Sequence, residues 1–268
     1  MSKPRDLRDR KDPEVWPVPE KQDKKGLERY EYSMFSLSGV DGVLRYLFSK
    51  VGFQSRMFLE FGFAAGENNS LRLAVKEGFG GLFIDGTELN VSTFINNTAL
   101  KLKLKNIKAI LEFLDLGNLK QIVTENINSE IDLLSIDVDG NDYWFWKELD
   151  FLQPRVAVIE YNASFGNSRS ITVPYDPCFK RHDKHQSGFY CGASLAALTK
   201  LGNSKGYALV GCDSTGFDAF FVRRDLLTED IKEVTVEEGY KPHQSRLERG
   251  VTTEEQFKII KNLPYIEV

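Results

Sequence analysis

The sequence has little of what marks secreted or membrane proteins. Its 268 residues include only three cysteines, Cys178, Cys191 and Cys212, and no C-x-x-C pair. Three cysteines cannot all pair with one another, which favours a reduced, cytoplasmic protein over a disulfide-stabilised one. No apolar run approaches the roughly 20 residues that span a bilayer, and the N-terminus lacks the apolar core of a signal peptide. We therefore expect no membrane span.

The chain also lacks a surplus of basic residues. Its formal net charge is -4 at pH 7, whereas proteins that hold nucleic acid through phosphate contacts carry clustered Lys and Arg. We therefore expect no nucleic-acid partner. With 41% hydrophobic and 28% charged residues, the composition is that of a globular protein large enough for one sizeable core.

What the chain does have is a change of pattern near residue 31. Residues 1–30 are rich in Lys, Arg, Asp, Glu and Pro and predict a charged N-terminal arm, through which a homo-oligomer could form. Residues 31–228 alternate between strand-like and helix-like patterns, which predicts one α/β domain. Residues 229–268 are again charged, and we expect them to pack on that domain as an extension.

The alternation predicts a sheet whose strands are apolar on both faces. The predicted strands are 56–63, 81–85, 107–113, 131–138, 155–161, 207–212 and 219–223, and the predicted helices are 39–51, 68–78, 90–104, 142–149, 194–201 and 253–261. Strands of this kind favour a parallel sheet covered by helices, and the last two predict a hairpin. The predicted fold is a doubly wound, mostly parallel Rossmann-like sheet with an antiparallel edge strand. Ligands of such sheets bind outside the carboxyl ends of the strands.

A glycine-bearing turn follows the first strand, in the stretch from Glu60 to Glu67 (EFGFAAGE). A dinucleotide-binding fold would need G-x-G-x-x-G, so that a pyrophosphate lies at a helix N-terminus. Counting from Gly62, the third glycine position falls on Glu67, an acid where the phosphate would lie. This argues against a dinucleotide.

The spacing E-x-G-x-A-x-G instead resembles motif I of class I S-adenosylmethionine-dependent methyltransferases, usually E/D-x-G-x-G-x-G, with Ala64 in place of the central glycine. The resemblance implies a Rossmann-like fold that binds S-adenosylmethionine, with Glu60 suited to the cationic aminoacyl end. The cofactor-binding residues that we predict in this stretch are Glu60, Phe61, Gly62, Gly66 and Asn68.

The same family places an acid after the second strand, where it accepts hydrogen bonds from the ribose hydroxyls. Asp85, followed by Gly86, fits this position 25 residues after Glu60, and Glu88 is the substitute. After the third strand, Asp115 lies where the family often holds the adenine edge. We predict Asp85, Gly86 and Asp115 as further cofactor-binding residues.

The fourth strand ends in LLSIDVDGND, which resembles the LLKIDVEG segment of FkbM-type methyltransferases, enzymes that commonly act on hydroxyls of sugars and natural products. The resemblance implies acceptor-side roles for Asp137 and Asp139. With Asp142 they place three acids within six residues, which would repel one another unless a cation or the sulfonium of the cofactor neutralises them. A solvated acidic turn is the alternative.

Some class I O-methyltransferases bind a divalent ion through an acid after strand four and an acid–Asn pair after strand five. Asp137 (or Asp139), Glu160 and Asn162 match this pattern with the oxygen ligands that Mg²⁺ prefers. The long segment 163–192 predicts a substrate cover, and its His185 is a candidate general base, with exposed surface histidines as the alternative.

The function that these residues predict is O-methylation of a sugar or another small-molecule hydroxyl by an S-adenosylmethionine-dependent methyltransferase. Two alternatives remain at this point. One is a NAD-dependent or nucleotide-sugar oxidoreductase, against which Glu67 counts. The other is a non-catalytic module with a degenerate cofactor pocket, which Ala64 would allow.

Overall fold

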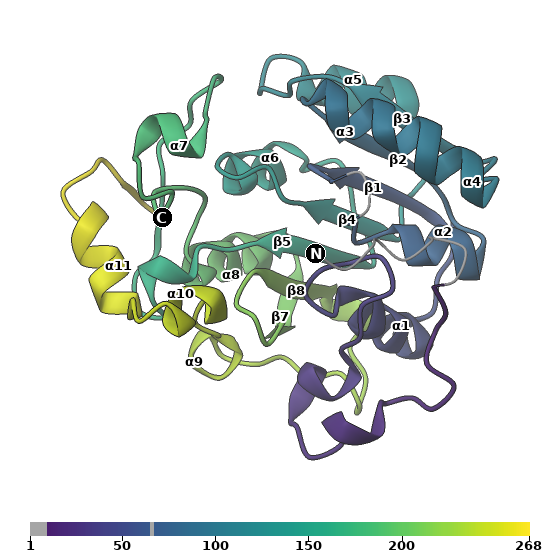
Figure 1. Cartoon of the computed structure of the whole chain (residues 1–268), viewed down its shortest axis with the longest axis horizontal. Helices are drawn as coiled ribbons and strands as arrows, with labels where there is room; N and C mark the ends of the chain where they lie inside the picture. Colours follow the sequence, from purple (N-terminus) through teal and green to yellow (C-terminus); the bar gives the residue numbers. More distant parts are fainter. Residues whose placement is uncertain (1–9, 65–66) are drawn as a thin grey trace.

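A seven-stranded sheet forms the centre of the protein in a computed structural model, which describes residues 10–64 and 67–268 (Figure 1). The strand order is β3-β2-β1-β4-β5-β8-β7. The strands are β1 (Met57–Phe61), β2 (Gly80–Asp85), β3 (Ile107–Leu111), β4 (Leu133–Ile136), β5 (Val156–Glu160), β7 (Tyr207–Cys212) and β8 (Asp218–Arg223). The first five are parallel, and β8 runs antiparallel to both β5 and the edge strand β7. The predicted fold class is confirmed, including the hairpin of β7 and β8.

Helices cover both faces of the sheet, because each strand is apolar on both sides. One face packs against α1 (Val40–Val51), α2 (Leu71–Glu77) and the continuous helical segment α3 (Glu88–Thr93), η4 (Phe94–Ala99) and α4 (Leu100–Leu102). The other face packs against α5 (Leu119–Asn126), α6 (Asp142–Glu148) and α8 (Leu195–Ser204).

Two helices differ in detail from their predictions. The helix predicted over 68–78 begins at Leu71 and ends at Gly78, whose φ of 70° is the left-handed conformation of a helix end. Asn68 does not cap it; the preceding Glu60 carboxylate holds the first backbone N–H groups instead. The sequence did not predict α5, which has only Leu119 and Val123 as buried residues and therefore a weak apolar period.

The described part of the N-terminal arm lies over helices α1 and α2. It contains η2 (Pro19–Lys21) and η3 (Gly26–Tyr30). Asp12 forms a two-pronged ion pair with the buried Arg72 of α2, at 2.8 Å for each bond. Trp16 packs beside Tyr30 and Tyr46, whose rings stack at 3.6 Å between centroids. These contacts anchor the segment, although its composition alone predicts little burial.

The segment 163–192 and the C-terminal residues share a small apolar core of their own, centred on Phe165, Ile171, Tyr190 and Ile260. Strand β6 of the segment pairs with β9 near the C-terminus. The elements of these regions are η5 (Ala163–Phe165), β6 (Ile171–Thr172), α7 (Arg181–Lys184), η6 (Arg224–Leu226), α9 (Val236–Gly239), α10 (Gln244–Glu248), α11 (Thr253–Ile260) and β9 (Ile266–Glu267). Within the described residues, no helix is long and apolar enough to cross a membrane.

Candidate active site

A pocket of about 340 Å³ opens at the carboxyl ends of the central strands. It lies where the strand order reverses, since β1 continues to β2 on one side and borders β4 on the other. Ligand sites of doubly wound sheets form at this switch point, and the volume is within the roughly 300–1,000 Å³ of small-molecule sites. The pocket therefore coincides with the edge at which the sequence placed its candidate residues.

Strand periodicity gathers five acids at this edge. Successive side chains of a strand point to opposite faces. The residues two positions from Glu60, Asp85, Glu160 and Asp218 along their strands are apolar and belong to the core beneath α1 and α2. For Asp137 this holds of Leu133, four positions earlier, so the five acids share that face. All five line the pocket. Five strands that lie far apart in sequence thus contribute one acidic wall.

Gly62 stands in the middle of this wall, directly after β1. Its φ is 70°, and a Cβ atom built there would lie 1.6 Å from the backbone oxygen of Asp137. Its N–H donates to the backbone oxygen of Ile84 at 3.0 Å. The ends of β1, β2 and β4 therefore approach one another so closely that only glycine fits.

Glu60 is fixed by the start of the next helix. Its carboxylate accepts hydrogen bonds from the backbone N–H groups of Asn69 at 2.9 Å and Ser70 at 2.8 Å. The residue is 2% exposed, and this burial, opposed by those hydrogen bonds, raises the pKa of Glu60 to about 7. Glu60 thus ties β1 to α2 as well as facing the pocket.

Asp85 is held in a similar way at the end of β2. One carboxylate oxygen accepts from the Thr87 N–H at 2.7 Å and from the Asn90 side chain at 3.3 Å, and the other accepts from the Phe63 N–H at 3.2 Å. Asn68 lies across the pocket, where its amide nitrogen donates to the Ala64 backbone oxygen at 3.0 Å. Both acids of this half are pre-organised by the backbone around them.

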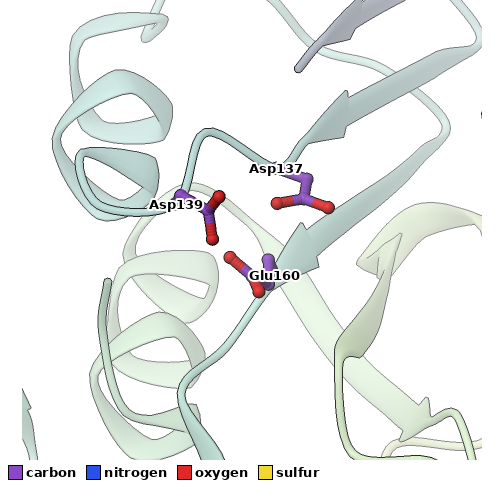
Figure 2. Close-up of side chains that lie close together, drawn as sticks. All are labelled: Asp137, Asp139 and Glu160. Atoms are coloured by element: carbon purple, nitrogen blue, oxygen red, sulfur yellow. The ribbon is translucent and has the colours of Figure 1, made fainter. Parts of the chain in front are cut away.

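Asp137 and Glu160 follow paired residues of β4 and β5 and face each other in the other half of the pocket (Figure 2). Their carboxylate oxygens lie within 4.8 Å of each other, close enough for two like charges to repel. Although Asp137 opens into the pocket, burial at the strand end and then the charge of Asp139 raise the pKa of Asp137 to about 7. Burial and the charge of Asp137 likewise raise the pKa of Glu160.

Asp139 reaches the same place through a turn that Asp142 stabilises. The fully buried Asp142 carboxylate accepts from the N–H groups of Val138 at 2.8 Å and Gly140 at 2.9 Å. Asp139 consequently takes a φ of 57°, which is rare for a non-glycine residue. Its side chain forms an ion pair with Arg181 of α7. Ligand oxygens of Asp137, Asp139 and Glu160 lie within 4.8 Å of one another.

The structure does not bring every predicted residue to the pocket. Phe61 is buried in the core against Phe145, and Gly86 lies beside Phe113. Asp115 instead accepts from the N–H groups of Gly117 and Asn118 and shapes the turn before α5. None of the three predicted cofactor-binding residues is among those that line the pocket in the described chain, and Gly66 lies outside the described residues.

Asn162 and His185, which we predicted on the acceptor side, are also not among the described residues that line the pocket. Asn162 is buried, with its amide nitrogen donating to the backbone oxygens of Phe189 and Cys191 and its oxygen accepting from the Ser164 N–H. The amide is therefore used by the fold, and Asp139 takes its place beside Asp137 and Glu160. The Nδ1 of His185 contacts the Ser187 hydroxyl at 2.8 Å, and His185 is not among the residues that line the pocket.

Arg181 and Asp218 are among the pocket residues that the sequence did not predict. Arg181 begins α7, a helix of four residues that is too short to show a periodicity. Asp218 begins β8, which the sequence placed from residue 219 onward. A period-two pattern with Phe220 and Val222 would have assigned Asp218 to the same face as Glu160, its cross-strand partner.

Comparison with known proteins gives structural likeness at low identity. No protein-family model matches this chain, and no curated protein matches it. An O-methyltransferase from Bacillus cereus in complex with SAH is similar at 20% identity and a TM-score of 0.45, covering 72% of this chain and 81% of its own. The N-terminal domain of EvdMO1 with SAH bound is 14% identical with a TM-score of 0.44, covering 69% and 80%. PKMT2 from Rickettsia typhi is 12% identical with a TM-score of 0.47, covering 75% and 56%.

Proposed function

We propose that the protein is an S-adenosylmethionine-dependent methyltransferase that acts on a hydroxyl of a small molecule, with a sugar or natural product of the FkbM type as the preferred acceptor class. The observation that carries the proposal is the arrangement of Glu60, Gly62 and Asp85 around one pocket at the switch point of the sheet. These are the positions at which the motif resemblance predicts the cofactor.

The residues present fit this cofactor. A carboxylate at Asp85 accepts from ribose hydroxyls, and Glu60 suits an ammonium group. None of the described residues donates a hydrogen bond to the Oδ1 atom of the buried Asn68, which leaves an acceptor for the ligand's donors. The close approach at Gly62 lets the ligand lie against the backbone. Acids on this wall would repel the pyrophosphate of NAD or of a nucleotide sugar, which disfavours the oxidoreductase alternative.

When bound, S-adenosylmethionine supplies an electrophilic methyl group on a sulfonium centre. The chain's own contribution is to hold the acceptor hydroxyl in line and to remove its proton. Asp137, which lies beside Glu160, would take that proton, because the pKa of Asp137 is about 7 and lies near neutral pH. The remote His185 would have no direct part.

A divalent ion fits the same acids. Three carboxylates within 4.8 Å, from Asp137, Asp139 and Glu160, offer the hard oxygen donors that Mg²⁺ prefers, and Asn162 does not belong to the set. A bound ion would lower the pKa of an acceptor hydroxyl. Titration of Mg²⁺ with a calorimeter tests this, and we expect Asp139→Asn to weaken binding of the ion.

Calorimetric titration with S-adenosylhomocysteine tests the proposal. We expect wild-type protein to bind this product and not NAD, and Asp85→Asn to weaken binding roughly tenfold, since it removes a charged acceptor of hydrogen bonds. Glu88→Gln is the matched control, because Glu88 is exposed three residues further along and outside the pocket. Binding of NAD instead would support the oxidoreductase, and binding without turnover would support the non-catalytic module.

A further inference from the structure

Asp218 carries a carboxylate for which the protein provides no partner. The residue lines the pocket and is 6% exposed. Across residues 10–64 and 67–268, no hydrogen bond or ion pair reaches this carboxylate. The backbone of Asp218 is engaged: its N–H donates to the Asp213 carboxylate at 2.6 Å, and its oxygen accepts from the Asp213 N–H at 3.0 Å. A buried acid without a donor costs free energy, so a ligand that supplies one gains that energy on binding.

Hydrogen bonds to the Asp213 carboxylate fix the backbone around Asp218. Asp213 is fully buried, and its carboxylate accepts from the N–H groups of Thr215 at 2.6 Å and Gly216 at 2.8 Å, in addition to that of Asp218. These bonds fix the turn between β7 and β8. Phe217, also in this turn, lines the pocket beside Asp218 with its ring packed on His243. The backbone that carries Asp218 is therefore fixed before a ligand binds.

The surroundings of Asp218 favour a positive ligand. Its cross-strand neighbour is Glu160, so the two side chains leave the sheet on the same face. Arg181 is the one base among the described residues that line the pocket, and it is already paired with Asp139. Asp218 is not part of the three-acid group that could hold a metal ion. Burial and the charge of Asp213 raise the pKa of Asp218 well above its usual range, and a bound ammonium group would favour its charged form.

We propose that Asp218 binds a protonated amine of the acceptor, so that the enzyme methylates a hydroxyl on a compound that also carries an amino group, such as an amino sugar. This rests on the proposed function, because it assigns the acceptor of the same site. An ammonium group would donate hydrogen bonds to the carboxylates of Asp218 and Glu160. An acceptor with a carboxylate at that position would be repelled.

Three sugars of the same ring size but different charge test this proposal. Protein saturated with S-adenosylhomocysteine is titrated with glucosamine, glucose and glucuronate at neutral pH. We expect glucosamine to bind at least roughly tenfold more tightly than glucose, because a charge-assisted hydrogen bond is gained, and glucuronate to bind most weakly. Equal affinities, or no binding of glucosamine, would overturn the proposal.

Asp218→Asn should remove the preference for glucosamine and leave the affinity for S-adenosylhomocysteine and for glucose unchanged. Asp218→Glu keeps the charge and should retain part of the preference. Asp225→Asn is the control for loss of one charge, because Asp225 is exposed beyond the other end of β8 and pairs with Arg223. A preference that survives in Asp218→Asn would assign the amine to another residue and overturn the proposal.

The same titrations separate this proposal from its alternatives. If wild-type protein fails to bind S-adenosylhomocysteine, the proposed function fails; if it binds this product but not glucosamine, only the amine assignment fails. If Asp218→Asn abolishes binding of Mg²⁺ and Mg²⁺ displaces glucosamine, the cation at Asp218 is a metal ion and the amine assignment is wrong.

Discussion

The two halves of the pocket use acids in opposite ways. On the side of β1 and β2, Glu60 and Asp85 accept hydrogen bonds from the backbone N–H groups of nearby loops. On the side of β5 and β8, Glu160 lies close to the acid Asp137, and the Asp218 carboxylate has no donor among the described residues. The first pair is complete without a ligand, and the second group is not.

This difference indicates that the half at β1 and β2 is held by hydrogen bonds of the protein itself, whereas the half at β5 and β8 needs a ligand to complete its hydrogen bonds. An acid with its hydrogen bonds made can position a loop and present one remaining lone pair to a ligand. Acids without donors are stabilised only by protons or by a bound cation. We therefore expect changes on the β1 side to affect folding and cofactor affinity together, and changes on the β5 and β8 side to affect the acceptor alone.

The largest effect is expected at Gly62, where the two halves of the pocket meet. Gly62→Ala would place a Cβ atom 1.6 Å from the backbone oxygen of Asp137 at a φ of 70°. We expect a loss of about 3 kcal/mol or more in the free energy of unfolding, together with loss of cofactor binding, measured by urea denaturation and calorimetry. Gly78→Ala is the control, since Gly78 has the same φ of 70° and open space around its Cβ position, and its cost should stay near about 1 kcal/mol. Similar costs for both would refute the close approach.

Asp137→Asn tests whether the acceptor half acts separately. We expect kcat to fall by roughly 100-fold or more, because a general base is removed, with affinity for S-adenosylhomocysteine changed less than about threefold. A methyl-transfer assay on whichever hydroxyl acceptor a substrate screen identifies, run beside calorimetry, measures both. Equal loss of turnover and affinity would instead assign Asp137 to the cofactor pocket or to the fold.

The pH dependence of the free energy of unfolding tests the role of Glu60 in the β1 half. Because the pKa of Glu60 rises from 4.5 to about 7 on folding, the folded protein holds this proton more tightly than the unfolded chain. The stability that the proton contributes is present below pH 4.5 and is lost as the pH rises through about 7. Relative to Glu60→Gln, wild-type protein should lose up to about 3 kcal/mol over this range in urea denaturation.

In the same denaturation series, Glu229→Gln, an exposed acid, should show no such change with pH. A difference between wild type and Glu60→Gln that is independent of pH would mean that the Glu60 pKa is the same in both states.

The smallest effect is expected at His185. Its ring contacts Ser187 and does not line the pocket. His185→Ala should therefore change kcat less than about twofold, in contrast to the roughly 100-fold or greater effect of a general base. A large fall in kcat with unchanged folding would mean that the segment 163–192 moves to bring His185 to the acceptor.

Much of the fold could be predicted from the sequence because its information is local. Strands with apolar residues on both faces and helices that end at residues such as Gly78 mark the parallel sheet, and the ends of β1, β2, β4 and β5 mark its active edge. Asp115 and Asn162 make contacts that the sequence did not predict. Each is short and polar and sits after a strand, but each satisfies nearby backbone groups instead of facing the pocket.

The sequence by itself determined the alternation of strands and helices, and with it the edge at which Glu60, Asp85 and Asp137 gather. Only the tertiary structure decided that β8 inserts beside β5 in the opposite direction and so places Asp218 opposite Glu160. The physical reason is that strand order depends on how helices and connections pack, whereas periodicity specifies only which face each residue takes.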